Sequence, residues 1–555
     1  MTGVDASRRW SLGPYRDANL WRTLLFTTWL VAGITLAMLA HDLPHNAFFV
    51  GDPGVKVIAS RNAISHPRRP LEIDLPTIDG KQVAFVDPFF RIHRDHAHAA
   101  TPELFPLVSA PFFAILGLGG AFVLPAVGFL LTASAIVALR TSFQPSASRL
   151  ISTAAALSST PLLFYGLEFW EHAVAVGVAG WATALFVMRR GTGSLFACGL
   201  LFGITILLRP EGAWYVVAVL GSSYVLERRP RVRQIAVVAC GITAACLPLI
   251  TYNIFHLGQV TGIHVASNMP ALRSHWLSAR TEIGRLWFDP GWISLRLVCI
   301  GATSAAALIV VSSWNHLLPM VTVALSIVIG GAAIGRWLPV NCLWAAAPTW
   351  LIAFALPMTR SNSRQYLVFV SIGYSVAILL TTPHDGGGQW GPRFLLFASI
   401  PVGVLLAEAW EDMVFEWRWI GSIVVTVLVL FGLLVERNAY KELQSAKRVY
   451  AALVDAIAQE TATGDYILTD LWWLDQVSAS LYPTRTFLFT PTLEQFEAAL
   501  RSFEQARVKS LLVAQSESES RWQFRNQLGT TGYFVTRSVV FAPRNLSLER
   551  IVMKQ

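Results

Sequence analysis

Long apolar runs return along this chain from Trp21 to Val435, and few folds can accommodate them. Runs that fill a window of about 19 residues are typical of helices that cross a lipid bilayer. The composition agrees, because 54% of the 555 residues are hydrophobic and only 14% are charged, whereas about 25% of a soluble protein is charged. We therefore predict an α-helical polytopic membrane protein.

Counting such windows predicts roughly thirteen transmembrane helices. In a bilayer each of them satisfies its backbone polar groups within its own helix. The expected spans, in chain order, are centred on Trp21–Ala40, Ala121–Leu139, Ile151–Gly166, Ala173–Met188, Leu195–Leu208, Trp214–Leu226, Ile235–Ile254, Gly291–Val311, Leu317–Ile334, Leu343–Pro357, Tyr366–Leu380, Phe394–Ala407 and Ile420–Val435.

The distribution of basic residues predicts the orientation of these spans. The net charge is +9, and the arginines cluster in alternate loops. Loops on the cytoplasmic side of a membrane protein carry an excess of Lys and Arg. With a cytoplasmic N-terminal tail, four clusters lie inside: Arg140 with Arg149, Arg189 with Arg190, Glu227–Arg233, and Arg360 with Arg364.

This topology predicts three parts of the chain. Residues 1–20 form the cytoplasmic tail, and residues 21–436 form a transmembrane domain with a long first outer loop at 41–120. Residues 437–555 form a small extracytoplasmic α/β domain, because charge rises there and the apolar runs shorten. Its expected elements are strands at Tyr466–Asp470, Thr486–Thr490 and Val508–Ala514 and an amphipathic helix at Leu493–Ala506.

Two classes of function are disfavoured by residues that the chain lacks. There is no zinc-finger spacing, no aromatic RNA-binding motif and no basic helix, so we expect no nucleic-acid partner. The cysteines lie in or beside apolar segments without a CxxC pair, and we interpret them as small core residues instead of disulfides or metal ligands. They are Cys198, Cys240, Cys246, Cys299 and Cys342.

Polar residues gather at the expected outer ends of the spans. The first outer loop opens with GDPGVK, which contains Asp52 and Lys56 and leads into a short helix. The other outer junctions carry EFWEH (168–172), RPEG (209–212) and GGGQWGPRF (386–394). Charged groups at membrane depth are costly and usually indicate a functional site. We therefore expect these junctions to converge.

These motifs resemble the C-type (GT-C) polytopic glycosyltransferases, such as the protein mannosyltransferases and the aminoarabinose transferases. Asp52 follows the first membrane helix, and FPLVSAPFFAILG leads into the second span. The resemblance implies sugar transfer, with inversion, from a polyprenyl-phosphate-linked donor to a glycan, lipid or protein acceptor at the extracytoplasmic face. It also favours a bacterial inner membrane.

The chemistry of that reaction suggests roles for the candidate residues. An acceptor loses a proton as it attacks, and a carboxylate held by a rigid turn can act as the general base. Asp52 is the candidate base; the alternatives are that it only caps the following helix, or that Asp87 is the base. Cations stabilise a departing lipid phosphate, and the candidates are Lys56, Arg209 and Arg393.

The remaining outer residues are candidates for contact with the sugar or the acceptor. On a continuous helix, Glu168 and Glu171 would share one face; the alternative is a charged helix boundary at the membrane interface. Arg209 and Glu211 are close enough to pair with each other. The full set of expected substrate-binding residues is Glu168, Glu171, His172, Glu211 and Gln389.

A divalent metal ion is a further possibility at RIHRDHAHA, where His93, Asp95, His96 and His98 are imidazole and carboxylate ligands. Their spacing matches no established site, so a solvated loop is the alternative and no metal ligand is assigned. For the whole chain the alternative function is a membrane transporter or a flippase of lipid-linked glycans. A transporter predicts polar breaks near the bilayer midplane in two related halves, and neither feature is evident. A scaffold and a glycan polymerase also stay open.

Overall fold

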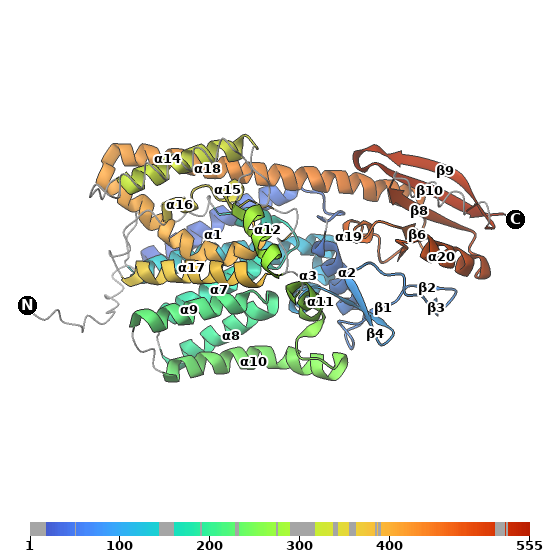
Figure 1. Ribbon diagram of the computed structural model, residues 1–555, viewed down its shortest axis with the longest axis horizontal. Coiled ribbons are helices and arrows are strands. Elements are labelled where there is room, and N and C mark those ends of the chain that lie inside the picture. The colour runs from blue at the N-terminus through green and yellow to red at the C-terminus, as the bar shows by residue number, and fades with distance from the viewer. Residues whose placement is uncertain are drawn as a thin grey trace, which may run out of the picture.

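The computed structural model describes residues 18–49, 51–143, 160–188, 191–227, 232–273, 276–288, 317–336, 342–353, 362–382, 386, 390–516, 528 and 531–554. A bundle of apolar helices and a β-sheet follow one another along the long axis of the molecule (Figure 1). We call the end of the bundle next to the sheet the sheet end, and the opposite end the far end.

Most of the described residues are helical, as the apolar runs predict. The bundle contains α1 (Ala18–His41), α4 (Val123–Phe143), α6 (Leu162–Leu167), α7 (His172–Met188), α8 (Thr192–Leu208), α9 (Gly212–Glu227), α10 (Val232–Leu257), α14 (Leu317–Ile334), α17 (Asn362–Thr381), the 3₁₀ helix η3 (Arg393–Ala398) and α18 (Ser399–Glu460). Among the described residues, five helical segments are long and apolar enough to cross a membrane: Leu104–Arg140, Val232–Leu257, Asn362–Thr381, Arg393–Phe415 and Ser422–Glu460. The length and composition of these helices therefore indicate an integral membrane protein.

The long helix α18 supplies two passes through the bundle. A straight helix of its 62 residues would be about 93 Å long. However, Arg393 just before it pairs with Asp52 and Lys447 in its last third pairs with Glu168, and both pairs lie at the sheet end. The helix therefore folds back at the far end, where its two membrane-crossing segments, Arg393–Phe415 and Ser422–Glu460, meet (Figure 1). Its second arm continues without a break past residue 436, where we expected a domain boundary.

Small residues bring neighbouring helices into close contact. A Cβ atom on Gly199 of α8 would overlap the carbonyl oxygen of Val238 in α10, and one on Gly241 of α10 would overlap that of Phe196. Membrane helices pack closely where such small residues meet. An alanine at either glycine would force the two helices apart.

The structure differs from the sequence-based expectations at one span and at one cysteine. The expected span Leu343–Pro357 is wrong as one helix, because its described part forms two short helices, α15 (Leu343–Ala346) and α16 (Trp350–Ala353). The span Gly291–Val311 and most of Ile151–Gly166 lie outside the described residues. Of the described cysteines, Cys240 is exposed instead of lying in the core, and none forms a disulfide.

The polypeptide beyond the sheet end forms a five-stranded mixed sheet in the order β7-β6-β8-β10-β9. β6 pairs in parallel with β7 and β8, and β10 pairs antiparallel with β8 and β9. The expected strands and amphipathic helix are present. Their bounds are β6 (Tyr466–Thr469), β7 (Thr486–Phe489), α20 (Leu493–Gln505), β8 (Ser510–Ser516), β9 (Tyr533–Phe541), η4 (Ala542–Arg544) and β10 (Leu546–Met553).

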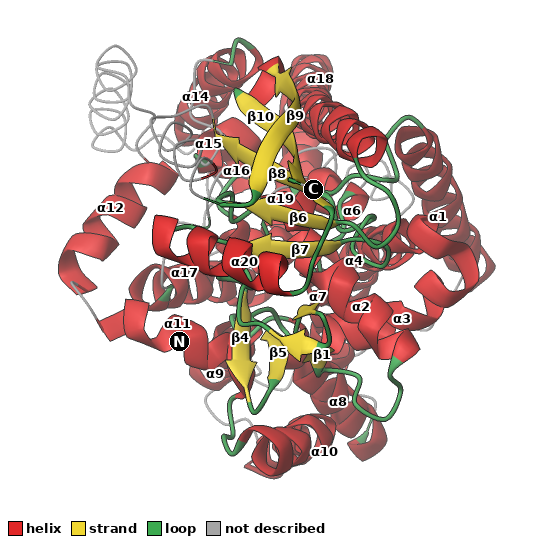
Figure 2. Cartoon of the chain, turned by 90° about the vertical axis from the view of Figure 1, so that its right-hand side faces the viewer, coloured by secondary structure: helices red, strands yellow, loops and turns green. Residues whose placement is uncertain are grey.

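The two faces of this sheet bury different partners. Successive side chains of a strand point to opposite faces. Ile467 and Leu512 pack against Leu453 and Ile457 on the last turns of α18. The other face packs against α20. The second arm of α18 is therefore one continuous rod that joins the bundle to the core of the sheet, and the sheet lies over the middle of the bundle when seen from its end (Figure 2).

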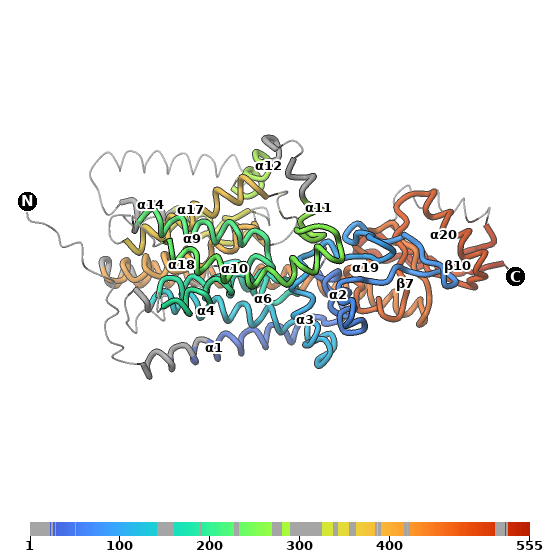
Figure 3. The backbone as a smooth tube through the Cα atoms, turned by 90° about the horizontal axis from the view of Figure 1, so that it is seen from below, coloured from blue at the N-terminus to red at the C-terminus, as the bar shows by residue number. Residues whose placement is uncertain are grey.

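The first outer loop lies between the bundle and the sheet (Figure 3). It contains α2 (Asp52–Ser65), β1 (Ile73–Asp74), β2 (Thr77–Ile78), β3 (Lys81–Gln82), β4 (Phe90–His93), β5 (His96–Ala99), α3 (Leu104–Leu116) and η1 (Gly117–Phe122). α3 packs against α2. The loop therefore forms a layer that separates the ends of the bundle helices from the sheet.

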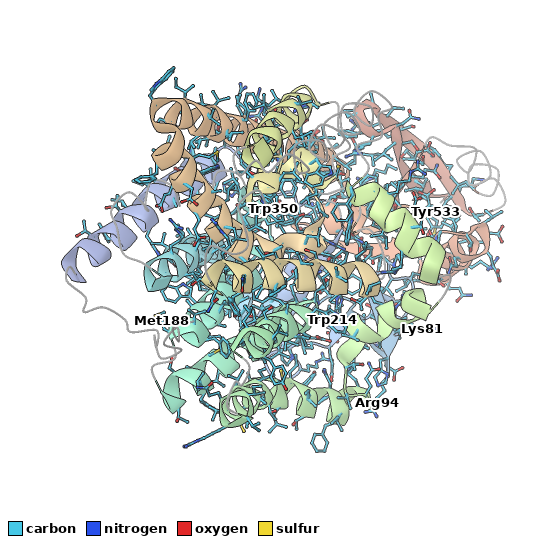
Figure 4. The ribbon with its side chains drawn as sticks, turned by 60° about the vertical axis from the view of Figure 1, so that its left-hand side comes forward. Lys81, Arg94, Met188, Trp214, Trp350 and Tyr533 are labelled. Atoms are coloured by element: carbon cyan, nitrogen blue, oxygen red, sulfur yellow. The ribbon has the colours of Figure 1, made fainter. Side chains whose placement is uncertain are left out.

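The far end carries a separate group of ion pairs. Arg140 lies 2.6 Å from Glu411 and 3.5 Å from Glu408, and Arg364 lies 3.4 Å from Glu408. Met188, where α7 ends, and Tyr533 in β9 lie on opposite sides of the molecule (Figure 4). Arg140 in the last turn of α4 and Arg364 in the first turn of α17 lie together at the far end, and the side of the membrane that this end faces stays a prediction.

Candidate active site

Asp52 is the first residue of α2, at the sheet end of the bundle. The preceding Gly51 has φ = +101°, a backbone conformation that favours glycine, and Pro53 lies in the first turn of the helix. The N-cap residue of α2 is Gly51, which has no side chain that could cap the helix. Asp52 lies one position inside the helix, which disfavours the interpretation of Asp52 as a simple N-cap.

Two cations flank that carboxylate. Oδ2 of Asp52 lies 3.5 Å from Nζ of Lys56, one helical turn later, and 3.5 Å from Nη1 of Arg393 in η3. The side chain of Asp52 is 13% exposed, whereas Lys56 is completely buried. Burial would raise the pKa of Asp52, but Lys56, Arg393 and Arg209 lower it below its usual range. Asp52 is therefore ionised at physiological pH.

A second set of ion pairs extends this network into the bundle. Glu171, completely buried between α6 and α7, lies 2.5 Å from Lys56 Nζ and 2.9 Å from Arg209 Nη1. Arg209 also pairs with Glu211, as the spacing of RPEG suggested. Three carboxylates thus balance three cations, so this buried cluster is neutral overall. Residues of all four expected outer junctions, GDPGVK, EFWEH, RPEG and GGGQWGPRF, meet here as predicted.

Arg393 and Lys56 are the two cations of this cluster that have a buried nitrogen without a hydrogen-bond partner among the described residues. The guanidinium of Arg393 lies over the ring of Phe394, 5.1 Å from the ring centre. Its Nε is buried without a hydrogen-bond partner among the described residues. The expected substrate-binding residue Gln389, in the preceding loop, lies outside the described residues. Because the side chain of Arg393 is 9% exposed and that of Lys56 is completely buried, Arg393 is the more accessible of the two to an incoming anion.

His172 begins α7 beside this cluster and is 3% exposed. Its ring packs 5.1 Å from that of Tyr165 and 5.7 Å from that of Trp170, measured between ring centres. Both of its ring nitrogens are buried without a hydrogen-bond partner in the described part of the chain. Buried polar groups normally have hydrogen-bond partners. An imidazole without one, next to the charged cluster, is therefore a candidate for contact with a ligand.

Glu168 and Glu171 do not share a helical face, and the structure instead shows the alternative, a charged helix boundary. α6 ends at Leu167 and α7 begins at His172, which leaves both glutamates in the connection between them. Glu168 instead accepts hydrogen bonds from Lys447 Nζ at 3.0 Å and from the backbone N–H of Phe49 at 3.3 Å. Both of its carboxylate oxygens thus have protein partners, which favours a structural role over contact with substrate.

Asp87, the alternative base, lies in a different cluster. It forms a buried carboxyl pair with Asp475 of α19 (Leu474–Val477), and the two side chains share a hydrogen bond. Burial and the neighbouring Asp87 raise the pKa of Asp475 well above its usual range. A small pocket lined by both aspartates and by Tyr482 lies beside them. One proton held between two carboxyl groups suits a structural contact between the first outer loop and α19.

Replacing Asp475 with Asn is expected to stabilise the protein at pH 8 but not at pH 4. The raised pKa means that the folded chain keeps a proton that the unfolded chain releases, so the free energy of unfolding falls as pH rises above the unfolded pKa. The amide of the Asp475→Asn variant can donate to Asp87 without taking up a proton. Thermal unfolding of the purified protein checks this, with an expected gain of roughly 2–4 °C at pH 8. The exposed Asp95→Asn exchange is the control, and an equal gain at both pH values would contradict the shared proton.

The histidine-rich segment forms a β-hairpin instead of a loop. β4 and β5 pair directly, and Arg94 and Asp95 at the turn have positive φ values of 47° and 57°, as a two-residue hairpin turn requires. His96 lies 3.8 Å from Glu72 and from Asp74. Within the described ranges, no three His, Cys, Asp or Glu side chains are placed to hold a metal ion.

Two residues of this region were not predicted as site residues. Lys447 reaches Glu168 from α18, and Oε1 of Gln476 accepts the N–H of Gly51 at 3.1 Å. Gln476 lies in α19, at the end of the segment TDLWWLDQ (469–476). No local pattern could have indicated either residue, because their partners lie 279 and 425 positions away in the chain.

No protein-family model matches the chain. No curated protein matches it in sequence. Among solved structures, ArnT from Cupriavidus metallidurans bound to undecaprenyl phosphate matches with a TM-score of 0.55 and 14% identity, over 96% of this chain and 98% of that chain. Its apo state matches over the same shares with a TM-score of 0.53 and 13% identity.

A more distant likeness is to the apo oligosaccharyltransferase of Archaeoglobus fulgidus, with a TM-score of 0.47 and 13% identity over 90% of this chain and 70% of that chain. ArnT is an aminoarabinose transferase and a GT-C glycosyltransferase. The likeness to ArnT extends along nearly the whole of both chains. It shows that this chain shares the fold of ArnT, as the resemblance of its motifs predicted.

Proposed function

We propose that this protein is an integral membrane glycosyltransferase that transfers a sugar from a polyprenyl-phosphate donor to an acceptor at the extracytoplasmic face. The observation that carries the proposal is the cluster at the sheet end, where Asp52 lies beside Lys56 and Arg393. A carboxylate next to cations with spare hydrogen bonds suits a reaction that removes a proton and releases a phosphate.

Asp52 acts as the general base in the proposed reaction. The acceptor O–H or N–H gives its proton to the Asp52 carboxylate while the acceptor atom bonds to the anomeric carbon from the face opposite the phosphate. The bond from that carbon to the phosphate oxygen breaks, and its electron pair leaves with the polyprenyl phosphate. The anomeric configuration is therefore inverted.

The cations couple donor binding to the strength of the base. In the free protein Lys56, Arg393 and Arg209 lower the pKa of Asp52. A bound phosphate competes for the same cations, so the pKa of Asp52 rises as the donor binds. Arg393, with its unpaired Nε, contacts the phosphate first, and Lys56 and Arg209 complete the site from their pairs with Glu171.

The remaining residues orient the sugar or the acceptor. His172, whose ring nitrogens are unpaired among the described residues, donates to or accepts from a sugar hydroxyl. Glu211 and Gln389 are the other proposed contacts with substrate, and Glu171 holds Lys56 and Arg209 apart at a fixed spacing. The undecaprenyl phosphate named in the ArnT structure is the donor lipid to test first.

The deciding experiment supplies membranes that contain the protein with a panel of radiolabelled polyprenyl-phosphate sugars. We expect label from one donor to move to an acceptor in those membranes, and membranes without the protein to show no transfer. If no donor is consumed but purified protein moves the labelled lipids across vesicle membranes, the flippase alternative replaces this proposal. The clustering of buried ion pairs at the two ends of the bundle disfavours that alternative.

Replacing Arg393 with Gln is expected to raise KM for the donor about 10- to 100-fold, because a charged hydrogen bond to phosphate contributes about 1.5–3 kcal/mol. Arg393→Lys keeps the charge and recovers part of the loss. Initial rates of polyprenyl phosphate release at varied donor concentration measure the effect. Arg285→Gln, at an exposed site, is the control. An unchanged KM would move phosphate binding to Lys56 and Arg209.

A further inference from the structure

We infer that Lys447 and Gln476, both from the C-terminal segment 437–555, are positioning residues for Asp52. The inference rests on the proposed function, since it gives these residues a purpose in the same reaction. Neither touches Asp52 directly. Each instead acts on the backbone turn that carries it, at Phe49 and at Gly51.

Gln476 holds the turn directly. It is completely buried, and its Oε1 accepts the N–H of Gly51 at 3.1 Å while its Nε2 donates to the carbonyl of Trp472 at 2.9 Å. The amide is thus fixed from both sides. Gly51 has the positive φ that aims the chain into α2, so this hydrogen bond stabilises the conformation from which the Asp52 side chain projects.

Lys447 holds the turn through Glu168. Its Nζ lies 3.0 Å from Oε2 of Glu168, and Oε1 of the same carboxylate accepts the N–H of Phe49 at 3.3 Å. Lys447 and Glu168 are both buried. The ammonium group also lies over the rings of Phe48, at 5.6 Å, and Phe122, at 4.8 Å. Removing one partner of such a buried pair is strongly destabilising.

Close packing makes this arrangement stiff. A Cβ atom on Gly54, in the first turn of α2, would overlap the carbonyl oxygen of Gln476. The backbone N–H of Phe48 also donates to the carbonyl of Val477 at 3.4 Å. The start of α2 therefore rests on the backbone of α19, and a shift of α19 is transmitted to Asp52.

Asp52 needs such support because its own side-chain contacts are long. Its ion pairs to Lys56 and Arg393 are both 3.5 Å, which leaves its position to the backbone. A displacement of about 1 Å in a catalytic group costs about 100-fold in rate. The C-terminal segment is therefore part of the active site's framework instead of an independent module.

The test uses the full-length protein and four variants. Lys447→Met removes the cation, Lys447→Arg keeps it, and Gln476→Met removes the acceptor for Gly51. In the double variant Glu168→Gln with Lys447→Met, a neutral amide still accepts the N–H of Phe49. Lys441→Met, at an exposed position of the same helix, is the control.

We expect kcat to fall about 100-fold in Lys447→Met and Gln476→Met with KM for the donor unchanged, and to recover in Lys447→Arg and in the double variant. Hydrogen–deuterium exchange of the segment 48–54 reads the turn without any substrate. Exchange there is expected to speed up in the two single Met variants only. If the wild type transfers no sugar but exchange still speeds up in the two single Met variants only, the proposed function is overturned and the positioning contact is kept. Unchanged kcat and exchange, or a loss confined to KM, would overturn the positioning role.

Discussion

Replacing Asp52 with Asn is expected to lower sugar transfer roughly 100- to 10,000-fold, which is the usual contribution of a positioned general base. The amide has the shape of the carboxylate but takes up no proton. Binding of undecaprenyl phosphate is expected to persist, because Lys56 and Arg393 stay in place and lose only a competing anion. Transfer from the active donor, measured in membranes at matched expression, checks the rate, and equilibrium binding of undecaprenyl phosphate checks retention.

Asp95→Asn is the matched control for that exchange. Asp95 is exposed in the same outer loop, at a positive-φ turn position that Asn tolerates well. Its transfer rate is expected to equal that of the wild type. If Asp52→Asn also kept full transfer, Asp52 would lose its role, and Asp87 and Glu171 would become the carboxylates to test.

Replacing Glu171 with Ala is expected to be the most destabilising single change in the cluster. Glu171 is completely buried and bridges Lys56 and Arg209, so its removal leaves both cations short of a partner. Breaking a buried ion pair from one side typically costs about 3–5 kcal/mol. Denaturant unfolding of the detergent-solubilised protein measures the loss, and donor binding is expected to weaken with it.

Glu282→Ala is the control for this loss. Glu282 pairs with Arg285 on α12 (Trp276–Phe288), but both side chains are more than half exposed, and surface pairs contribute about 0–1 kcal/mol. If Glu171→Ala lost no more unfolding free energy than Glu282→Ala, the result would contradict the bridging role of Glu171. It would show that Glu211 and Asp52 alone satisfy the two cations.

The apolar runs predicted most of the bundle because hydropathy is a local property. α7 begins and ends within one residue of the expected span Ala173–Met188, and α8 ends at Leu208 as expected. The span Leu343–Pro357 failed for the opposite reason, since an apolar run can also fold as two short buried helices. Composition cannot distinguish these outcomes.

The candidate site was predictable in its location but not in its contacts. Topology alone placed Asp52, Glu171, Arg209 and Arg393 at the same ends of their helices, and the structure joins them in one cluster. However, the prediction that Glu168 and Glu171 share one helical face required a continuous helix across 168–172. The chain instead breaks between α6 and α7, which turns the two carboxylates toward different cations.

By itself, then, the amino-acid sequence determined that this chain is a membrane-embedded helical protein with charged groups gathered at one end of its helices. Only the tertiary structure decided which charges pair, that α18 folds back on itself, and that Lys447 and Gln476 hold the turn before Asp52. The physical reason is range. The cost of placing a side chain in lipid depends on its own segment, whereas an ion pair depends on the distance between two groups that the fold alone brings together.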